Sequence, residues 1–428
     1  MNATQSWTHL KNIIECLVKM HVPIVQRRTT DKPMWMTGAA ARAVQVKQRR
    51  WRSYRAGKTN LSEYRTAEKK SKNLLRKAKR NFERKLAKDA KVNPRRFYAY
   101  LNRKKKGNKV GPLVDALGAV HSKEEDMVNI FNETFVSAFN DNKIQHPPPV
   151  SFGSGATIST VQFTPDIVRK KLESLRTSSA PGPDGIHPRL LKECANEMSV
   201  PLSIVFEKSM NERVVPTDWK STNVSPIFKK GEKSRAENYR PVNLASVPSK
   251  IMESIIKDAL FEHLKANNCI VGSQHGFVPG RSVTTNLIEY LNIITAALDE
   301  GVPFDTIMVD FRRAFDRVPF EGMIAKAEAH GIGGDLLGWI SDWTKDRRQR
   351  VVLNGIESEW VNVTSSVVQG SVLGPVLFLL YINCIDKAIR SHDDDIMVSK
   401  FADDTKVGRK IYEMNDSASL QTALNSLG

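Results

Sequence analysis

Three carboxylates stand directly after short apolar runs, at two places far apart in the chain. Asp310 closes one run, while Asp403 and Asp404 are neighbours within KFADDTKV, which starts at residue 400. In a plain strand adjacent side chains point to opposite faces, so one acid of the pair would be buried without a partner. A tight turn avoids this by holding both near one point. The plainer interpretation is a polar turn that closes a hairpin, with Asp310 as a strand-end residue.

The two runs become more informative if they form neighbouring strands, because all three carboxylates then meet. Repulsion would keep such a cluster stable only around cations, and hard divalent ions with oxygen ligands, Mg²⁺ first, are what carboxylates select. Two ions about 3.5 to 4 Å apart could activate an attacking hydroxyl and stabilise a departing phosphate group. We therefore expect a two-metal site at Asp310, Asp403 and Asp404.

The chain is long enough for two or three domains, and its charge is uneven. It has 428 residues, 40% of them hydrophobic, and a formal net charge of +19. Residues 42–109 hold 26 Lys and Arg against 4 Asp and Glu, so the remainder carries about −3. Basic helices with aromatic residues suit a phosphate backbone and unpaired bases, although a solvated charged helix explains the same composition.

Four cysteines, at positions 16, 194, 269 and 384, are too scattered to suggest a disulfide framework or a zinc site. There is no secretory signal, and the longest apolar run is too short and too interrupted by Gly-Pro to span a bilayer. These features predict a soluble, intracellular protein without membrane contact, located in the nucleus or the cytoplasm.

Patterning divides the chain into four parts: a weakly patterned segment at 1–41, a basic helical connector at 42–140, a linker at 141–160 and an α+β part at 161–428. In the connector, Asn60 with Glu63 and Ser122 with Glu125 resemble capping boxes, and Asn93-Pro94 should end the first helix.

The α+β part alternates between helical and strand-like patterns, without an internal repeat. We expect helices over 165–176, 188–212 and 248–266, strands over 222–228 and 304–311, and a hairpin turning at Asn354-Gly355. The strand over 304–311 is expected to be buried, because its apolar residues are nearly continuous.

Several motifs together resemble the reverse transcriptases. MVDFRRAFDRV, VVQGSVLGPVLFLLYIN and KFADDTKV resemble the three catalytic motifs of that family, in its order and spacing. Upstream, APGPDGI, VSPIFKKGEKSRAENYRPVNL, SKIMESII and QHGFVPGRSVTTNL resemble the finger motifs of non-LTR retrotransposon polymerases, most like jockey-type and chicken-repeat-type elements. The resemblance covers about residues 165–410. It implies a right-hand polymerase of fingers and palm, with an antiparallel palm sheet, after a basic helical N-terminal region.

The resemblance assigns roles position by position. It makes Asp310, Asp403 and Asp404 the catalytic acids that bind the metal, with the main-chain carbonyl of Phe311 as a further ligand. The nucleotide would be bound by Lys229, Lys230, Arg240, Phe315, Gln369 and Gly370, where Phe315 is the aromatic gate that favours dNTPs. The template would be contacted by Pro181, Gly182, Asp184, Gly185, Gly280 and Arg281. We interpret Asp316 as structural, in a helix that begins after the strand.

The implied function is that of an RNA-directed DNA polymerase. It would use two Mg²⁺ ions, with Mn²⁺ as a substitute, to join dNTPs to a DNA primer on an RNA template that includes the element's own RNA. One alternative is an inactive retroelement remnant that binds nucleic acid through its basic segment. Another, an RNA-templated RNA polymerase, is disfavoured by Phe315.

The sequence also departs from the complete elements that it resembles. No endonuclease pattern precedes the polymerase motifs, no thumb motif follows them, and Val368 stands where proline is common. We therefore expect fingers and palm only.

Overall fold

The computed structural model describes residues 1–23, 33–94, 97–98, 100–101, 110–115, 117–139, 155–311, 313–390 and 393–425. Most of the predicted linker at 141–160 lies outside the described residues. The chain forms two compact units, one of Met1–Val18 with Gly111–Gly428 and one of Lys19–Val110. The four-part division expected from the sequence stays a prediction. No helix among the described residues is long and apolar enough to cross a membrane.

The helices before residue 220 are α1 (Ala3–His21), α2 (Gly38–Arg55), α3 (Leu61–Lys88), α5 (Glu124–Val136), α6 (Pro165–Glu173), α7 (Pro188–Glu193), α8 (Ala195–Glu212) and the 3₁₀ turn η1 (Thr217–Lys220). Those after it are η2 (Ala236–Asn238), α9 (Val247–Ala266), α10 (Val283–Asp299), α11 (Phe320–Ala329), α12 (Gly334–Thr344), α13 (Gly374–Ile382), α14 (Ile385–Arg390) and α15 (Met414–Asn425).

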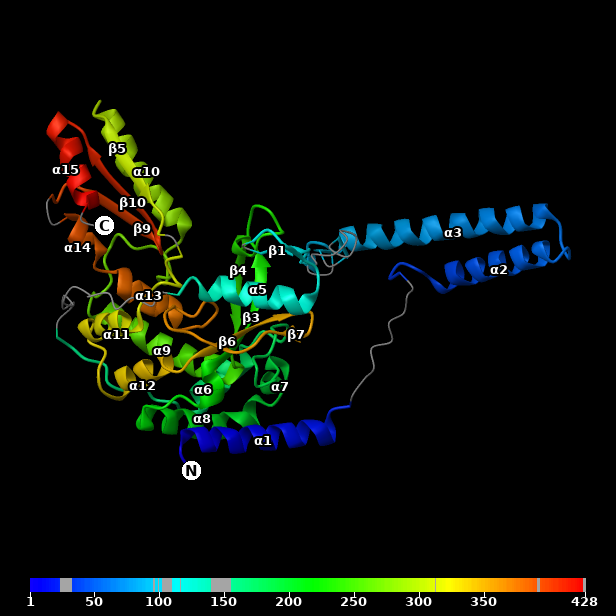
Figure 1. The fold of residues 1–428 in the computed structure, drawn as a ribbon, viewed down its shortest axis with the longest axis horizontal. Helices are drawn as coiled ribbons and strands as arrows, with labels where there is room; N and C mark the ends of the chain where they lie inside the picture. The colour runs from blue at the N-terminus through cyan, green and yellow to red at the C-terminus, as the bar shows by residue number, and fades with distance from the viewer. Residues whose placement is uncertain are drawn as a thin grey trace. The chain divides into compact units, whose positions relative to one another are not determined.

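The strands are β1 (Leu113–Val114), β2 (Val120–His121), β3 (Ser221–Phe228), β4 (Tyr239–Leu244), β5 (Phe304–Val309), β6 (Arg348–Leu353), β7 (Ile356–Glu357), β8 (Val361–Asn362), β9 (Met397–Phe401) and β10 (Asp404–Lys410). The mixture of helices and sheets confirms the α+β class (Figure 1).

The unit Lys19–Val110 contains the long helices α2 and α3, which lie side by side (Figure 1). The side chain of Asn60 caps α3 by accepting from the backbone N–H of Glu63 at 3.0 Å, so this predicted cap forms. The helix ends at Lys88, a few residues before the predicted stop. The Trp51 ring lies 4.9 Å from the Tyr64 ring, which leaves an aromatic cluster among the basic side chains.

Helix α1 is the first element of the larger unit and was not expected from the weak pattern of residues 1–41. Its Trp7 is fully buried, and the Trp7 and Trp219 rings meet edge to face at 5.2 Å. Lys11 pairs with Asp218 at 2.7 Å. One aromatic anchor and one ion pair therefore hold a helix that periodicity alone does not reveal.

The five-stranded sheet has the order β4-β3-β6-β7, with β8 also paired to β6. Strands β3 and β4 are antiparallel, and β3 and β6 are parallel. The predicted hairpin is confirmed: β6 and β7 join through Asn354 and Gly355, whose φ values of 52° and 92° both lie in the left-handed region.

The three-stranded sheet is antiparallel, in the order β5-β10-β9 (Figure 1). Helix α10 contacts β9 and β5, and α15 contacts β10. The expectation of a buried strand over 304–311 is wrong, because none of the β5 residues is buried and Met308 is 71% exposed. The strand lies at the sheet edge with β10 as its partner. A continuous apolar run therefore does not by itself show that a strand is buried.

Two smaller expectations need correction. The second capping box does not form, since α5 starts after Lys123 without a side-chain cap, and its first turn carries three acids instead. The helix predicted over 165–176 ends at Glu173. The main core lies between α6, α8, α9, α12 and α13, and fully buried Trp339 and Trp343 lie within it.

Candidate active site

The two predicted strands are neighbours, and this brings the three carboxylates to one end of the small sheet. Strand β10 pairs antiparallel with β5, with Thr405 opposite Val309, so one further step in the same register sets Asp404 opposite Asp310. Strand β9 pairs with β10 through Phe401 and Asp404, which leaves Ala402 and Asp403 as the turn.

The turn has an unusual backbone, because Ala402 has a φ of 58° and is buried. A left-handed conformation at the first residue of a two-residue connection matches the twist of antiparallel strands, although it costs about 1 kcal/mol or more for a residue other than Gly. The strand pairing and the neighbouring loops must therefore stabilise this turn.

The three carboxylates repel one another. Burial raises the pKa of the Asp403 carboxyl, and the charges of Asp404 and Asp310 raise that pKa further, while Lys229 lowers it. A cation placed among these oxygens would remove the repulsion and favour the ionised form. The donor set, made of hard carboxylate oxygens, therefore fits a divalent metal ion.

The carboxylates have the right chemistry for a divalent metal ion, but their positions do not yet form a coordination shell. Among the residues that the structure describes, no group of three or more His, Cys, Asp or Glu side chains lies close enough to hold a metal ion as it stands. A metal would therefore have to draw the three acids closer together.

A cavity of about 630 Å³ opens beside the turn and gathers residues from several motifs. Eight of the predicted site residues line it: Asp310, Phe311 and Asp403 from the metal set, and Lys229, Arg240, Phe315, Gln369 and Gly370 from the nucleotide set. The β3–β4 turn brings Lys229, and the start of β4 brings Arg240, to the same cavity that Asp310 lines after β5 and Asp403 lines from the β9–β10 turn.

Phe315 lies in the turn after β5, at the wall of the cavity. Its ring stacks on that of Phe378 at 4.3 Å, and the ring of Phe277 meets it edge to face at 6.0 Å. Its carbonyl accepts from the backbone N–H of Val367 at 2.7 Å. The ring is therefore held in place from both sides, as a rigid wall requires.

The loop with Gln369 and Gly370 approaches strand β4 closely. The carbonyl of Gln369 accepts from the backbone N–H of Asn243 at 2.9 Å. Gly370 has a φ of 104°, and a Cβ there would lie 2.7 Å from the carbonyl oxygen of Asn243. Both the backbone conformation and the space therefore require glycine at this position.

Asp316 belongs to the cavity wall, which the sequence did not indicate. It lies in a turn, and α11 begins only at Phe320, so the expectation that Asp316 lies in the helix after the strand is wrong. Its Oδ1 accepts from Nε2 of Gln369 at 3.1 Å. Burial raises the pKa of Asp316, which is 9% exposed.

Glu253 supports the same loop from behind. This α9 residue is 1% exposed, and its Oε2 accepts from the backbone N–H groups of Val372 at 2.8 Å and Leu373 at 3.3 Å. Its Oε1 accepts from Ser249 and Trp343. The sequence offered one signal, an acid within the apolar pattern of SKIMESII, and its role depends on contacts more than 100 residues away.

The remaining predicted residues do not line this cavity. Lys230 is exposed in the β3–β4 turn, and Asp404 is exposed at the start of β10. Gly182 packs so closely against Ala245 and Ser246 that a Cβ would lie 2.6 Å from their backbone atoms. Gly280, with a φ of 79°, also lies outside the cavity.

Buried Asp184 accepts from the backbone N–H of Ile186 at 3.3 Å, within its own loop, where Pro181 and Gly185 also lie. Arg281 donates to the carbonyl oxygens of Gly272 and Gln274. These contacts give Asp184, Gly182 and Arg281 structural roles, and their contact with template stays a prediction.

Comparison with known proteins agrees with this geometry. Residues 227–427 match the family model described as reverse transcriptase (RNA-dependent DNA polymerase). The chain is 26% identical over 323 residues to a probable RNA-directed DNA polymerase from transposon X-element of Drosophila melanogaster, which covers 74% of this chain and 36% of that protein.

Two further relatives from the same organism are similar to this chain. The RNA-directed DNA polymerase from mobile element jockey is 25% identical over 56% of this chain and 26% of its own length. The probable RNA-directed DNA polymerase from transposon BS is 27% identical over 49% of this chain and 23% of its own length. The chain thus spans about a third or less of the curated relatives that it matches. It carries a reverse transcriptase domain of the kind found in non-LTR retrotransposons.

Proposed function

We propose that this domain is the fingers and palm of an RNA-directed DNA polymerase that adds dNTPs to the 3′-hydroxyl of a primer. The observation that carries the proposal is the single cavity where Asp310 and Asp403 face Lys229 and Arg240. The acids suit the metal ions that would assist the reaction of a nucleoside triphosphate, and the cations suit its phosphates.

Reverse transcriptases generally use divalent metal ions. We propose that Asp310, Asp403 and Asp404 hold two Mg²⁺ ions, with Mn²⁺ as a substitute and with the carbonyl of Phe311 as a further ligand. Such ions supply Lewis acidity for the attacking and leaving oxygens. The chain itself supplies the positions of the three acids and a neutralising charge at Lys229, which already lowers the pKa of Asp403.

The remaining wall of the cavity suits selection of the nucleotide. We propose that Phe315, whose ring contacts Phe378 and Phe277, crowds a ribose 2′-hydroxyl and so favours dNTPs. We propose that Gln369 and Gly370 lie along the incoming base, and the backbone contact with Asn243 supports this by fixing the loop. RNA template, DNA primer and dNTPs are therefore the proposed partners.

Primer extension on a primed RNA template tests this function. The full chain should incorporate dNTPs in Mg²⁺, and Asp310→Ala or Asp403→Ala should lower the rate by at least about 10³-fold, because each removes a metal ligand. Asp305→Ala is the matched control, since Asp305 is an exposed acid on β5, the strand that leads to Asp310. Extension that survives both site variants, or rNTP use that exceeds dNTP use, would count against the proposal.

A second candidate function is binding of nucleic acid by the unit Lys19–Val110. The specific observation is the aromatic cluster around Trp51, which is 41% exposed on basic helices. The exposed residues Arg76, Lys79 and Arg80 of α3, changed together to Gln in the full chain, should weaken RNA binding. The log–log salt slope should fall by about 2 to 3. Asp403→Ala should leave this binding unchanged.

A further inference from the structure

The segment 273–276 extends the small sheet beside β9, immediately before the acidic turn. The backbone N–H of Lys400 donates to the carbonyl of Ser273 at 2.8 Å, and the N–H of His275 donates to the carbonyl of Lys400 at 2.8 Å. Gln274 and Lys400 thereby form a parallel bridge. This places part of the QHGF motif against the strand that leads into the Ala402–Asp403 turn.

The side chain of Gln274 reaches the turn itself. Its Oε1 accepts from the backbone N–H of Ala402 at 3.0 Å and from that of Gly276 at 2.7 Å. Its Nε2 lies 3.5 Å from the carbonyl oxygen of Ala402, to which it donates. Two N–H donors converge on one atom, so that atom must be the amide oxygen. Gln274 is 1% exposed, and water therefore does not compete for these bonds.

The close approach of the two segments depends on Gly276. A Cβ on Gly276 would lie 2.2 Å from the backbone nitrogen of Ala402, a distance that no side chain tolerates. Ala402 is the left-handed residue of this turn, so the side chain of Gln274 bonds directly to the turn residue whose backbone is strained.

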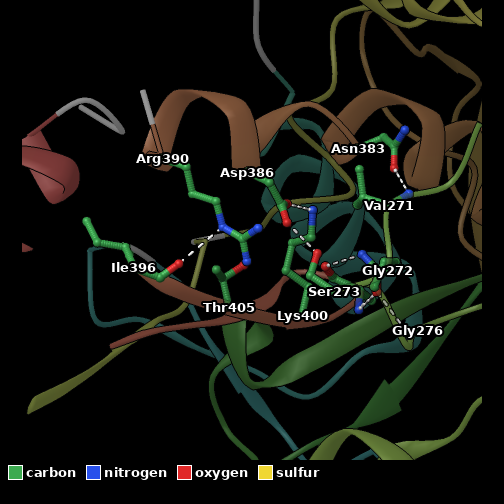
Figure 2. Close-up of polar contacts among 12 residues, drawn as sticks. Val271, Gly272, Ser273, Gly276, Asn383, Asp386, Arg390, Ile396, Lys400 and Thr405 are labelled. Carbon is green, nitrogen blue, oxygen red and sulfur yellow. Dashed lines mark hydrogen bonds and ion pairs between the residues drawn. The ribbon is translucent and has the colours of Figure 1, made fainter. Parts of the chain in front are cut away.

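Other contacts hold β9 but do not touch the turn. The ammonium group of fully buried Lys400 pairs with Asp386, which also accepts from the hydroxyl of Ser273, as Figure 2 shows. Asn286 donates to the hydroxyl of Ser399 at 2.7 Å and to the carbonyl of Lys400 at 3.2 Å. These groups position the strand, whereas Gln274 acts directly on Ala402.

We propose that Gln274 is a positioning residue that fixes the Ala402–Asp403 turn, so that Asp403 stays beside Asp310 and Asp404, where a divalent cation can draw the three acids together. The inference rests on the proposed function only in assigning these acids to a metal. Gln274 does not line the cavity. It acts through the backbone of Ala402.

Two variants of Gln274 separate its hydrogen bonds from its volume. Gln274→Met keeps a side chain of similar length and removes the acceptor, while Gln274→Glu keeps the acceptor for Ala402 and Gly276. Asn286→Ala is the matched control. It also removes a buried amide that bonds to β9, but this amide does not contact the Ala402–Asp403 turn.

Binding of Mn²⁺ alone to the full chain, followed through the electron paramagnetic resonance signal of the free ion, is the first measurement. We expect Gln274→Met to weaken binding about tenfold, and Gln274→Glu and Asn286→Ala to stay within about threefold of the wild type, since only the first loses the acceptor for the backbone N–H of Ala402. Thermal unfolding by circular dichroism should show all three variants folded at the assay temperature.

Wild-type Mn²⁺ affinity in folded Gln274→Met would overturn the inference, and so would equal losses in Gln274→Met and Gln274→Glu. Primer extension distinguishes this failure from failure of the proposed function. If the wild type extends primers and Gln274→Met does so with unchanged kcat, only the inference is wrong. If neither the wild type nor any variant extends primers while Gln274→Met alone still weakens Mn²⁺ binding, the inference holds and the proposed function is wrong.

Discussion

Gln369 and Asp316 join two sequence motifs at the wall of the cavity, through a hydrogen bond of 3.1 Å from Nε2 of Gln369 to Oδ1 of Asp316. Both residues line the same space as Asp310. Because the amide nitrogen is engaged, the amide of Gln369 is held in one orientation. Asp316, which the sequence suggested was only structural, therefore sets the direction of a proposed nucleotide contact.

This relationship predicts that Asp316 and Gln369 act as a unit. Asp316→Ala should lower kcat/KM for a single dNTP on a primed RNA template by about tenfold, the effect of losing one oriented hydrogen bond of about 1.4 kcal/mol. Asp316→Asn, which keeps an acceptor oxygen, should lose less. The double variant with Gln369→Ala should lose no more than the worse single variant, and additive losses would show that the residues act separately.

Asp316 also predicts a pH dependence of stability. Burial raises the pKa of its carboxyl, so the folded chain binds this proton more tightly than the unfolded chain. The free energy of unfolding therefore falls as pH rises from the unfolded value of about 3.9 through the raised folded value. Asp316→Asn lacks this loss, so urea titrations from low to neutral pH should increasingly favour it over the wild type. A difference that does not change with pH would contradict this.

Glu253 is predicted to stabilise the fold as well as the loop. Glu253→Ala leaves the N–H groups of Val372 and Leu373 without their acceptor and should lower the free energy of unfolding by about 3 kcal/mol. Glu262→Ala is the control, since Glu262 is an exposed acid on the same helix. Urea unfolding of the full chain, followed by circular dichroism, measures both, and equal midpoints would refute the role.

Gly276 provides a steric test with a control a few residues away. Gly276→Ala should lower the free energy of unfolding by about 1 to 3 kcal/mol and reduce primer extension, because its Cβ collides with the backbone of Ala402. Gly272→Ala should leave both unchanged, since a Cβ there meets nothing within 4 Å. The melting midpoint and the primer-extension rate of the two variants are compared. A Gly276→Ala variant that matches the wild type in both would mean that the two segments lie further apart.

Local signals predicted much of the fold. The strand over 222–228, the long helix over 248–266 and the Asn354-Gly355 hairpin all formed, because strand patterning, helical periodicity and turn residues are read over a few positions. The strand that ends just before Asp310 and the strand that starts at Asp404 also formed, and they are neighbours.

What could not be predicted depends on distant contacts. Helix α1 is held by Trp7 against Trp219, a pairing that no local pattern reveals. The roles of Glu253 and Gln274 likewise require partners over 100 residues away. A buried polar residue shows its purpose only when its partner is known, and composition does not supply that partner.

The exposed position of β5 bears on how the protein behaves at high concentration. Beyond β10, the pairing that the described residues show leaves one edge of β5 open, and Met308 projects from this strand. Open strand edges recruit other strands, and natural proteins guard them with charge. Exposed Asp305 adds charge to this edge, and a valine there, unlike the small alanine of the control variant, would create a longer apolar edge and invite intermolecular sheet growth.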